Sequence, residues 1–347
     1  MKHFAYSLTA VALAAAVGQA QAVTFSTFVS GGDLASVLSN NATIGFAYAG
    51  DKFVGSVYYG ANNNQLYSTD LTGGSVAKFG SPIPGFSGEV YVSSSLGIGG
   101  YGPRDIFAGS EAMGSVYRVA HDGSSQGLFT SGLAGGVRSI AFDPYGLYGN
   151  NMIVATNAGM VYRVDSAGTA SVLANVGEDA EGLSFAPQNF GTYAKGTLFV
   201  ASEGSGSLRA ISPTGTVNTV MSGLYGAEMV SFVPLNLGTS GDPVEGFYAA
   251  SYAIDVQKAA AADFIPYKGH AVITGETGHQ VWDVAYDVGL GTYTVAQIGT
   301  FPAQPEDGIF VSKDIIRPAV PEPEIMAMVL AGLGVVGGTA WRRRRQM

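Results

Sequence analysis

Gly114-Ser115-Val116-Tyr117-Arg118-Val119 and Gly159-Met160-Val161-Tyr162-Arg163-Val164 are two copies of one short pattern, and Gly206-Ser207-Leu208-Arg209-Ala210-Ile211 is a third. The copies start 45 and 47 residues apart. Each one follows a strand-like run, and these runs read IFAGSEA, MIVATNA and LFVASEG. Each is followed by a turn and then by another apolar run. The chain therefore repeats a unit of short strands separated by turns.

A second pattern recurs between these copies and ends in phenylalanine. Its clear copies are Val137-Arg138-Ser139-Ile140-Ala141-Phe142, Glu181-Gly182-Leu183-Ser184-Phe185 and Glu228-Met229-Val230-Ser231-Phe232. Fainter copies are Glu89-Val90-Tyr91-Val92 and Glu306-Asp307-Gly308-Ile309-Phe310. Four short strands per repeat form the blade of a β-propeller. A β-sandwich would give no reason for a sequence unit of this length, so we predict an all-β propeller.

The number of blades depends on which copies begin a blade. Five copies predict five four-stranded blades within a propeller domain at 23–318. The copy at Glu306 has little chain after it, so we expect it to close the ring by completing the N-terminal blade. Six blades follow if Ile44 to Tyr48 is a further inner strand. The long interval before Glu306 predicts an insertion at about 252–269, with a short helix from Val256 to Phe264.

The composition limits the partners and the means of stabilisation. The chain has 347 residues, no cysteine and 50 glycines, and only 12% of its residues are charged. A domain without disulfides depends on its own core. With the charged residues of the two terminal segments set aside, the net charge is about −12. Such a charge argues against nucleic acid or anionic lipid as a partner.

The N-terminus has the three parts of a secretory signal peptide. Met1 to His3 is basic, Phe4 to Val17 is apolar, and Ala20 and Ala22 form a small-residue cleavage pattern. We expect residues 1–22 to be removed after Ala22. An uncleaved anchor is the alternative.

The C-terminus combines three segments of different character. Pro321 and Pro323 flank Glu322 after Val320, and an uncharged run extends from Ile325 to Trp341. This run of 17 residues spans roughly 26 Å as a helix, against a hydrocarbon core of about 30 Å. Four arginines follow, at Arg342, Arg343, Arg344 and Arg345, and would stay on the cytoplasmic side as a membrane stop. Without the prolines, an ordinary tail anchor would be the simplest interpretation.

The segment 319–347 resembles the PEP-CTERM sorting tail of Gram-negative bacteria. The resemblance rests on Val320, Pro321, Glu322 and Pro323, the transmembrane helix at 325–341 and the terminal arginines. It implies a membrane transpeptidase of the exosortase type as a partner. It also implies an inner-membrane-anchored intermediate that is then released to the cell envelope, the surface or the extracellular space. The family's association with exopolysaccharide suggests a ligand of that kind.

The repeated unit resembles six-bladed, calcium-dependent propellers of the gluconolactonase and NHL kind. The resemblance is one of pattern. The glutamate, asparagine and aspartate ligands of those proteins have no one-to-one counterparts here, so none is assigned.

The candidate site comes from the second repeated pattern. Arg138, Glu181 and Glu228 stand four residues before its phenylalanine, and Glu89 and Glu306 occupy the equivalent place in the fainter copies. At the start of inner strands, these side chains would gather around one mouth of the central channel. Such a ring of carboxylates can hold a cation such as Ca²⁺ or share protons. The alternative is that the carboxylates face water and pair with Arg138 or loop amides.

Other catalytic arrangements are not evident in the sequence. His121, His270 and His279 lack zinc-ligand spacing, no Gly-x-Ser-x-Gly elbow occurs, and a cysteine nucleophile is excluded. Two hypotheses remain. The favoured one is a non-catalytic exported surface or matrix protein whose propeller binds a polysaccharide or another envelope component. The other is an exported metal-dependent hydrolase or lactonase that uses a cation at the channel mouth.

Overall fold

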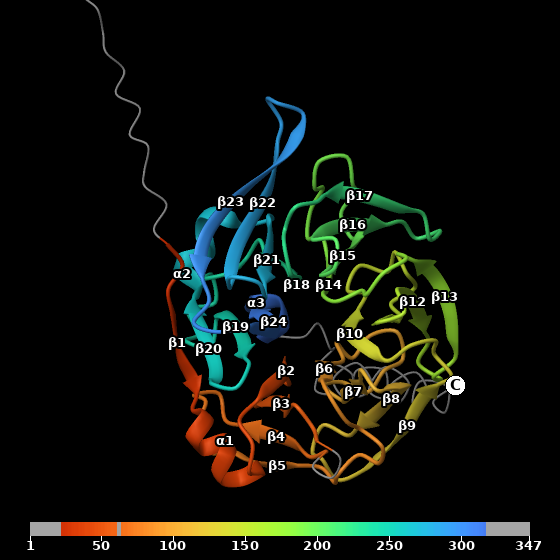
Figure 1. Cartoon of the computed structure of the whole chain (residues 1–347), viewed down its shortest axis with the longest axis vertical. Helices are drawn as coiled ribbons and strands as arrows, with labels where there is room; N and C mark the ends of the chain where they lie inside the picture. Colours follow the sequence, from red (N-terminus) through yellow and green to blue (C-terminus); the bar gives the residue numbers. More distant parts are fainter. Residues whose placement is uncertain (1–21, 61–63, 317–347) are drawn as a thin grey trace, which may run out of the picture.

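The computed structural model describes residues 22–60 and 64–316. Six sheets of four strands each are arranged around a central channel (Figure 1). The sequence left five and six blades open, and the structure has six. The additional blade exists because Thr43–Tyr48 forms an inner strand of its own.

In each blade the first-named strand lies innermost, beside the channel, and the last-named strand lies outermost. The first blade is β2 (Thr43–Tyr48), β3 (Phe53–Val57), β4 (Leu66–Thr69) and β5 (Ala77–Phe79), and the second is β6 (Val90–Ser94), β7 (Ile106–Ser110), β8 (Met113–Val119) and β9 (Gln126–Ser131). The third is β10 (Val137–Phe142), β11 (Met152–Thr156), β12 (Met160–Val164) and β13 (Ala170–Asn175), and the fourth is β14 (Leu183–Phe185), β15 (Leu198–Ser202), β16 (Ser207–Ile211) and β17 (Val217–Met221). The fifth is β18 (Ala227–Phe232), β21 (Ala271–Gly275), β22 (Gln280–Asp287) and β23 (Thr292–Thr300), and the sixth is β24 (Pro305–Val311), β19 (Gly246–Ser251), β20 (Asp255–Ala260) and β1 (Phe25–Val29).

The core lies between neighbouring blades. Strands β7, β11 and β15 are buried along their whole length, because each blade is covered on both faces. The phenylalanine that ends the repeated pattern joins one blade to the preceding one. Phe142 packs edge-on against Phe107 with ring centroids 5.2 Å apart, and Phe232 packs against Phe199 at 5.0 Å. The repeated pattern therefore reflects the packing between neighbouring blades as well as the order of the strands.

The two ends of the described chain meet in the sixth blade. Strand β1 pairs with β20 on the outside, and β24 pairs with β19 on the inside. Strands β19 and β20 come between β18 and β21 in sequence, although β18 and β21 belong to the fifth blade. The chain thus leaves the fifth blade after one strand, forms the middle of the sixth, and returns. Pairing the two ends in one sheet closes the ring.

Residues 252–269, expected as an insertion, lie in this excursion. The helix expected from Val256 to Phe264 is confined to α2 (Ala261–Phe264), followed by the 3-10 turn η1 (Ile265–Tyr267). Val256 to Ala259 pair instead with both β1 and β19, so strand pairing overrides the helix propensity of Ala259.

Two further helices flank the closing blade. Helix α1 (Gly31–Leu38) follows β1, and the Ser30 side chain caps it by accepting a hydrogen bond from the Gly32 amide. Helix α3 (Lys313–Ile316) follows β24, and its residue Ile315 lines the channel.

The terminal segments expected from the sequence lie outside the described residues. These are the signal peptide apart from Ala22, the motif at 320–323, the helix at 325–341 and the four arginines. Within 22–60 and 64–316, no helix has the length and apolarity needed to cross a membrane.

Candidate functional site

Four inner strands carry an irregularity near their start, and in three of them a charged residue lies there. The pairing register shifts between Val137 and Ser139 in β10, which leaves Arg138 out of the ladder. Equivalent shifts in β18 and β24 leave Glu228 and Glu306 out. A β-bulge of this kind bends the strand and re-aims the side chain of the extra residue. The same local device therefore brings three side chains to one end of the channel.

Glu181 and Glu89 reach the same end without a bulge in their strands. Glu181 lies two residues before β14, where its amide donates to the carbonyl of Ala201 at 3.0 Å. Glu89 directly precedes β6. We call the end of the channel where Arg138, Glu181, Glu228 and Glu306 meet the channel mouth.

Arg138 occupies one side of the channel mouth. Its Nη1 donates to Glu89, and its Nε and Nη2 donate to Oδ2 of Asp179 at 3.1 and 3.0 Å. The Tyr91 hydroxyl also donates to Glu89, at 2.8 Å. Glu89 is thus held in an ion pair with Arg138, and Glu111 lies 3.5 Å from the same guanidinium. This side of the mouth already contains its cation.

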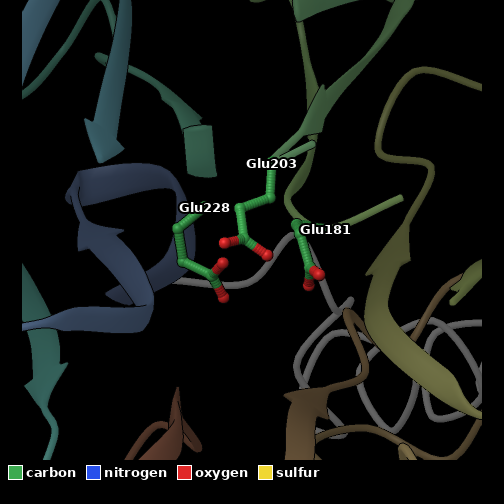
Figure 2. A group of neighbouring side chains, drawn as sticks. All are labelled: Glu181, Glu203 and Glu228. Atoms are coloured by element: carbon green, nitrogen blue, oxygen red, sulfur yellow. The ribbon is translucent and has the colours of Figure 1, made fainter. Parts of the chain in front are cut away.

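The other side of the channel mouth consists of glutamates. Carboxylate oxygens of Glu181, Glu203 and Glu228 lie within 4.8 Å of one another, and Figure 2 shows the three side chains converging. Glu228, Glu276 and Glu306 form a second group within the same distance. Glu228 belongs to both groups. We call them the first and the second triad.

Gln304 orients the second triad. Its Nε2 donates to Oε1 of Glu276 at 2.6 Å and to Oε1 of Glu306 at 3.0 Å. One amide group therefore holds two carboxylates that would otherwise repel each other. Such a hydrogen bond from outside the triad fixes the direction of a carboxylate without occupying its remaining oxygen.

Several buried oxygens of the channel mouth have no hydrogen-bond partner. Glu181 is 1% exposed, and neither of its carboxylate oxygens accepts a hydrogen bond, although Arg138 Nε lies 3.1 Å from Oε1. Glu306 is fully buried, and its Oε2 also lacks a partner. A buried carboxylate oxygen without a partner is costly. A hard divalent cation bound by several oxygens would remove this cost.

Burial and mutual repulsion favour protonation of the cluster. Burial, and next the charge of Glu228, raise the pKa of Glu181 well above its ordinary value. Burial and Glu306 do the same to the pKa of Glu228. Burial and Glu203 raise the pKa of Glu276 to about 7. A divalent cation that replaces these protons would let the carboxylates ionise together.

The repeated pattern identified Glu181, Glu228 and Glu306 but missed Glu203 and Glu276. These two residues each stand directly after the second strand of a blade. The second strand runs antiparallel to the first, so its end lies beside the start of the inner strand. The sequence does mark this position. The runs IFAGSEA and LFVASEG both have a glutamate directly after the strand, and MIVATNA has an asparagine there.

Outside the triads, the channel contains a cavity, and two histidines lie beside aspartates. A cavity of about 260 Å³ extends from the channel mouth and is lined by Asp307, by serines that include Ser139 and Ser231, and by apolar side chains. His121 lies 3.2 Å from Asp51, and His270 lies 2.9 Å from Asp283. The metal-suited groups within 22–60 and 64–316 contain glutamates only. An all-oxygen donor set suits Ca²⁺, Mg²⁺ or Mn²⁺.

Comparison with family models matches the tail. The model described as the PEP-CTERM protein-sorting motif matches residues 319–345. The motif indicates an exported protein that is sorted at the membrane by an exosortase. No protein with a curated description matches the chain at a significant level.

Comparison with solved structures bears on the propeller. One similar chain comes from the crystal structure of a nidogen/laminin complex, with 13% identity, a TM-score of 0.51, and coverage of 77% of this chain and 83% of that one. Another is virginiamycin B lyase from Staphylococcus aureus, with 10% identity, a TM-score of 0.51, and coverage of 82% and 77%. At such identities the similarity shows the fold alone.

Proposed function

We propose that this protein is an exported surface or matrix protein whose propeller is a non-catalytic binding module. The motif at 319–345 supports its export and its sorting. A signal peptide at 1–22 and a transient membrane helix at 325–341 are part of the proposal. An exosortase-type transpeptidase is the processing partner, and the processed protein resides in the envelope or outside the cell.

The channel mouth is the binding site in this proposal. A divalent cation, with Ca²⁺ as the first candidate, binds there and recruits a ligand rich in hydroxyl and carboxylate groups, such as an acidic exopolysaccharide. The observation that carries this is the set of buried carboxylate oxygens on Glu181 and Glu306 that accept no hydrogen bond. Without a cation, the glutamates would repel an acidic polymer. With one, sugar oxygens can replace waters in its coordination shell.

A metal-dependent hydrolase or lactonase is the second candidate. The cavity of about 260 Å³ beside the triads favours it, because a small substrate could enter there. It ranks second because the residues that line the described channel include no histidine and the chain contains no cysteine. Turnover of a lactone or ester that is lost in Glu228→Gln would reverse this order.

A melting experiment tests the cation site. The full-length protein in detergent is freed of metal with a chelator, and its melting temperature is followed during addition of Ca²⁺ or Mn²⁺. At a hundred times the dissociation constant, binding stabilises by about 2.7 kcal/mol, which corresponds to a rise of roughly 5 °C. Glu228→Gln should abolish the rise.

Glu178→Gln is the matched control. The Glu178 carboxylate pairs with Arg209 and accepts from Ser205, and it belongs to neither triad. This variant should keep the full rise. Absence of any shift with either cation in the wild type would refute the cation site.

A further inference from the structure

The two triads overlap in a single residue. We propose that the channel mouth binds two divalent cations side by side, with the Glu228 carboxylate as the bridge between them. This inference rests on the proposed function and goes beyond it, because a single cation would satisfy that function. It concerns how many cations the site holds and which residue joins them.

The oxygens available match two positions. Glu181 and Glu203 serve the first cation, and Glu276 and Glu306 serve the second. Glu228 has two carboxylate oxygens and lies within 4.8 Å of both pairs, so it can give one oxygen to each cation. In known two-metal sites the cations lie about 3.5–4 Å apart, a separation that a bridging carboxylate spans.

The charges point to the same number. The two triads contain five glutamates, and one of these, Glu181, already lies against the Arg138 guanidinium. Because Arg138 is shared with Glu89 and Asp179, the five triad carboxylates together would carry a charge of about −4 to −5 when ionised, most of which two divalent cations balance. A single cation would leave about half of that charge uncompensated among side chains that are mostly buried, and uncompensated buried charge is unfavourable.

The two positions differ in how they are prepared. The second triad is held by Gln304, which contacts Glu276 and Glu306 and leaves Oε2 of Glu306 free. The first triad lies beside Arg138, whose positive charge opposes a cation near Glu181. We therefore expect the second position to fill first and to bind more tightly.

Stoichiometry tests the proposal. The metal-free full-length protein in detergent is titrated with Ca²⁺ by calorimetry, and bound ions are counted by native mass spectrometry. The wild type should bind two Ca²⁺ ions per chain. Glu203→Gln should retain the tighter ion and lose the weaker one, and Glu276→Gln should lose the tighter one. Glu178→Gln should still bind two.

Adjacency needs its own readout. The metal-free wild type is loaded with two equivalents of Mn²⁺ and examined by electron paramagnetic resonance. Two bridged ions should give an exchange-coupled spectrum, which Glu228→Gln should convert into that of isolated ions or of free Mn²⁺. Circular dichroism of each variant shows whether the fold is retained.

The possible outcomes distinguish failure of the paired cation site from failure of the proposed function. A wild-type stoichiometry of one ion overturns the paired site and leaves the proposed function standing. Two ions with uncoupled spectra overturn the Glu228 bridge. No bound ion overturns both the pair and the cation site itself. These readouts need only the wild-type protein, so a variant that fails to fold does not decide the matter.

Discussion

Arg138 stands at a position where the other copies of the repeated pattern carry glutamate. Its burial disfavours the charge, but Glu181 and Asp179 outweigh that effect and raise the pKa of Arg138. The guanidinium is therefore a permanent cation within the acidic channel mouth. It divides the mouth into a side that is neutralised by the protein and a side that is left to a ligand.

Replacing Arg138 with glutamine should destabilise the metal-free protein. Removing one partner of a buried ion pair costs about 3–5 kcal/mol, and we expect a loss of that size in the free energy of unfolding at pH 8. At pH 5 the loss should be smaller, because the neighbouring carboxylates accept protons. Denaturant unfolding at both pH values measures it. Arg118→Gln, which removes a half-exposed partner of Asp105, should cost less, and an equal cost would contradict this account.

The stability of the metal-free protein should fall as the pH rises from 5 to 8. In the folded state the pKa of Glu276 is raised from 4.5 to about 7, first by burial and then by Glu203. Between these values the folded protein holds a proton that the unfolded chain has lost, so rising pH favours unfolding. Melting temperatures in chelator provide the measurement. Glu276→Gln should show a shallower fall, and identical slopes in the two proteins would argue against this assignment.

At the residue scale, the sequence predicted part of the channel mouth. Glu228 and Glu306 were identifiable because they occupy bulges at a fixed place before a phenylalanine. Ile44 lies at the corresponding register shift in the first blade. Because isoleucine is uncharged, no charged residue marks this position in the sequence. Pairing of the carboxylates with Arg138 was the alternative that the sequence left open, but the choice of Glu89 as the partner depends on the distance between two blades, which no local pattern contains.

At the element scale, two tyrosines connect successive blades in the same way. The Tyr101 hydroxyl, from the loop before β7, accepts from the Met152 amide at 2.9 Å and donates to the Val164 carbonyl. The Tyr148 hydroxyl, from the loop before β11, accepts from the Leu198 amide at 2.9 Å and donates to a carbonyl of β16. Each hydroxyl thus satisfies the ends of two strands in the next blade.

Tyr148→Phe should weaken the contact between the third and fourth blades. The change leaves the Leu198 amide and the Ile211 carbonyl buried without a partner, at a cost of about 1–3 kcal/mol in the free energy of unfolding. Denaturant unfolding measures this cost. Tyr225→Phe is the control, because Tyr225 is 73% exposed and should change little. A loss as small as that of the control would show that the hydroxyl does not stabilise the contact.

The elements themselves were largely predictable because strand order and blade contact repeat together. The end of β20 was an exception, since the run of alanines at 259–262 favours a helix in isolation. The strand excursion between the fifth and sixth blades was another. Exchange of strands between adjacent blades leaves the alternation of apolar and polar residues unchanged, so the sequence of β19 and β20 gives no sign of the blade to which they belong.

At the scale of the whole molecule, the tail determines the fate of the propeller in the proposed function. The double variant Pro321→Ala, Pro323→Ala should keep its C-terminal segment and stay with the inner membrane, because the stiff motif that the transpeptidase recognises is lost. Mass spectrometry of the mature protein and fractionation of the cells measure this. Pro302→Ala, at an exposed position on the propeller, should be processed normally. Identical masses and locations for the wild type, the double variant and Pro302→Ala would exclude sorting through this motif.

The sixth blade takes its strands from residues 25–29, 246–260 and 305–311. When a polypeptide is secreted from its N-terminus, the first four blades emerge as contiguous stretches of sequence. Strand β19, in contrast, can pair with its inner neighbour β24 only after almost every residue has emerged. The sorting motif begins at 319, only a few residues beyond Val311. The ring of blades therefore closes when β24 emerges, at the same stage at which the tail reaches the bilayer. A chain stalled any earlier would retain an unpaired strand edge, which is prone to aggregate.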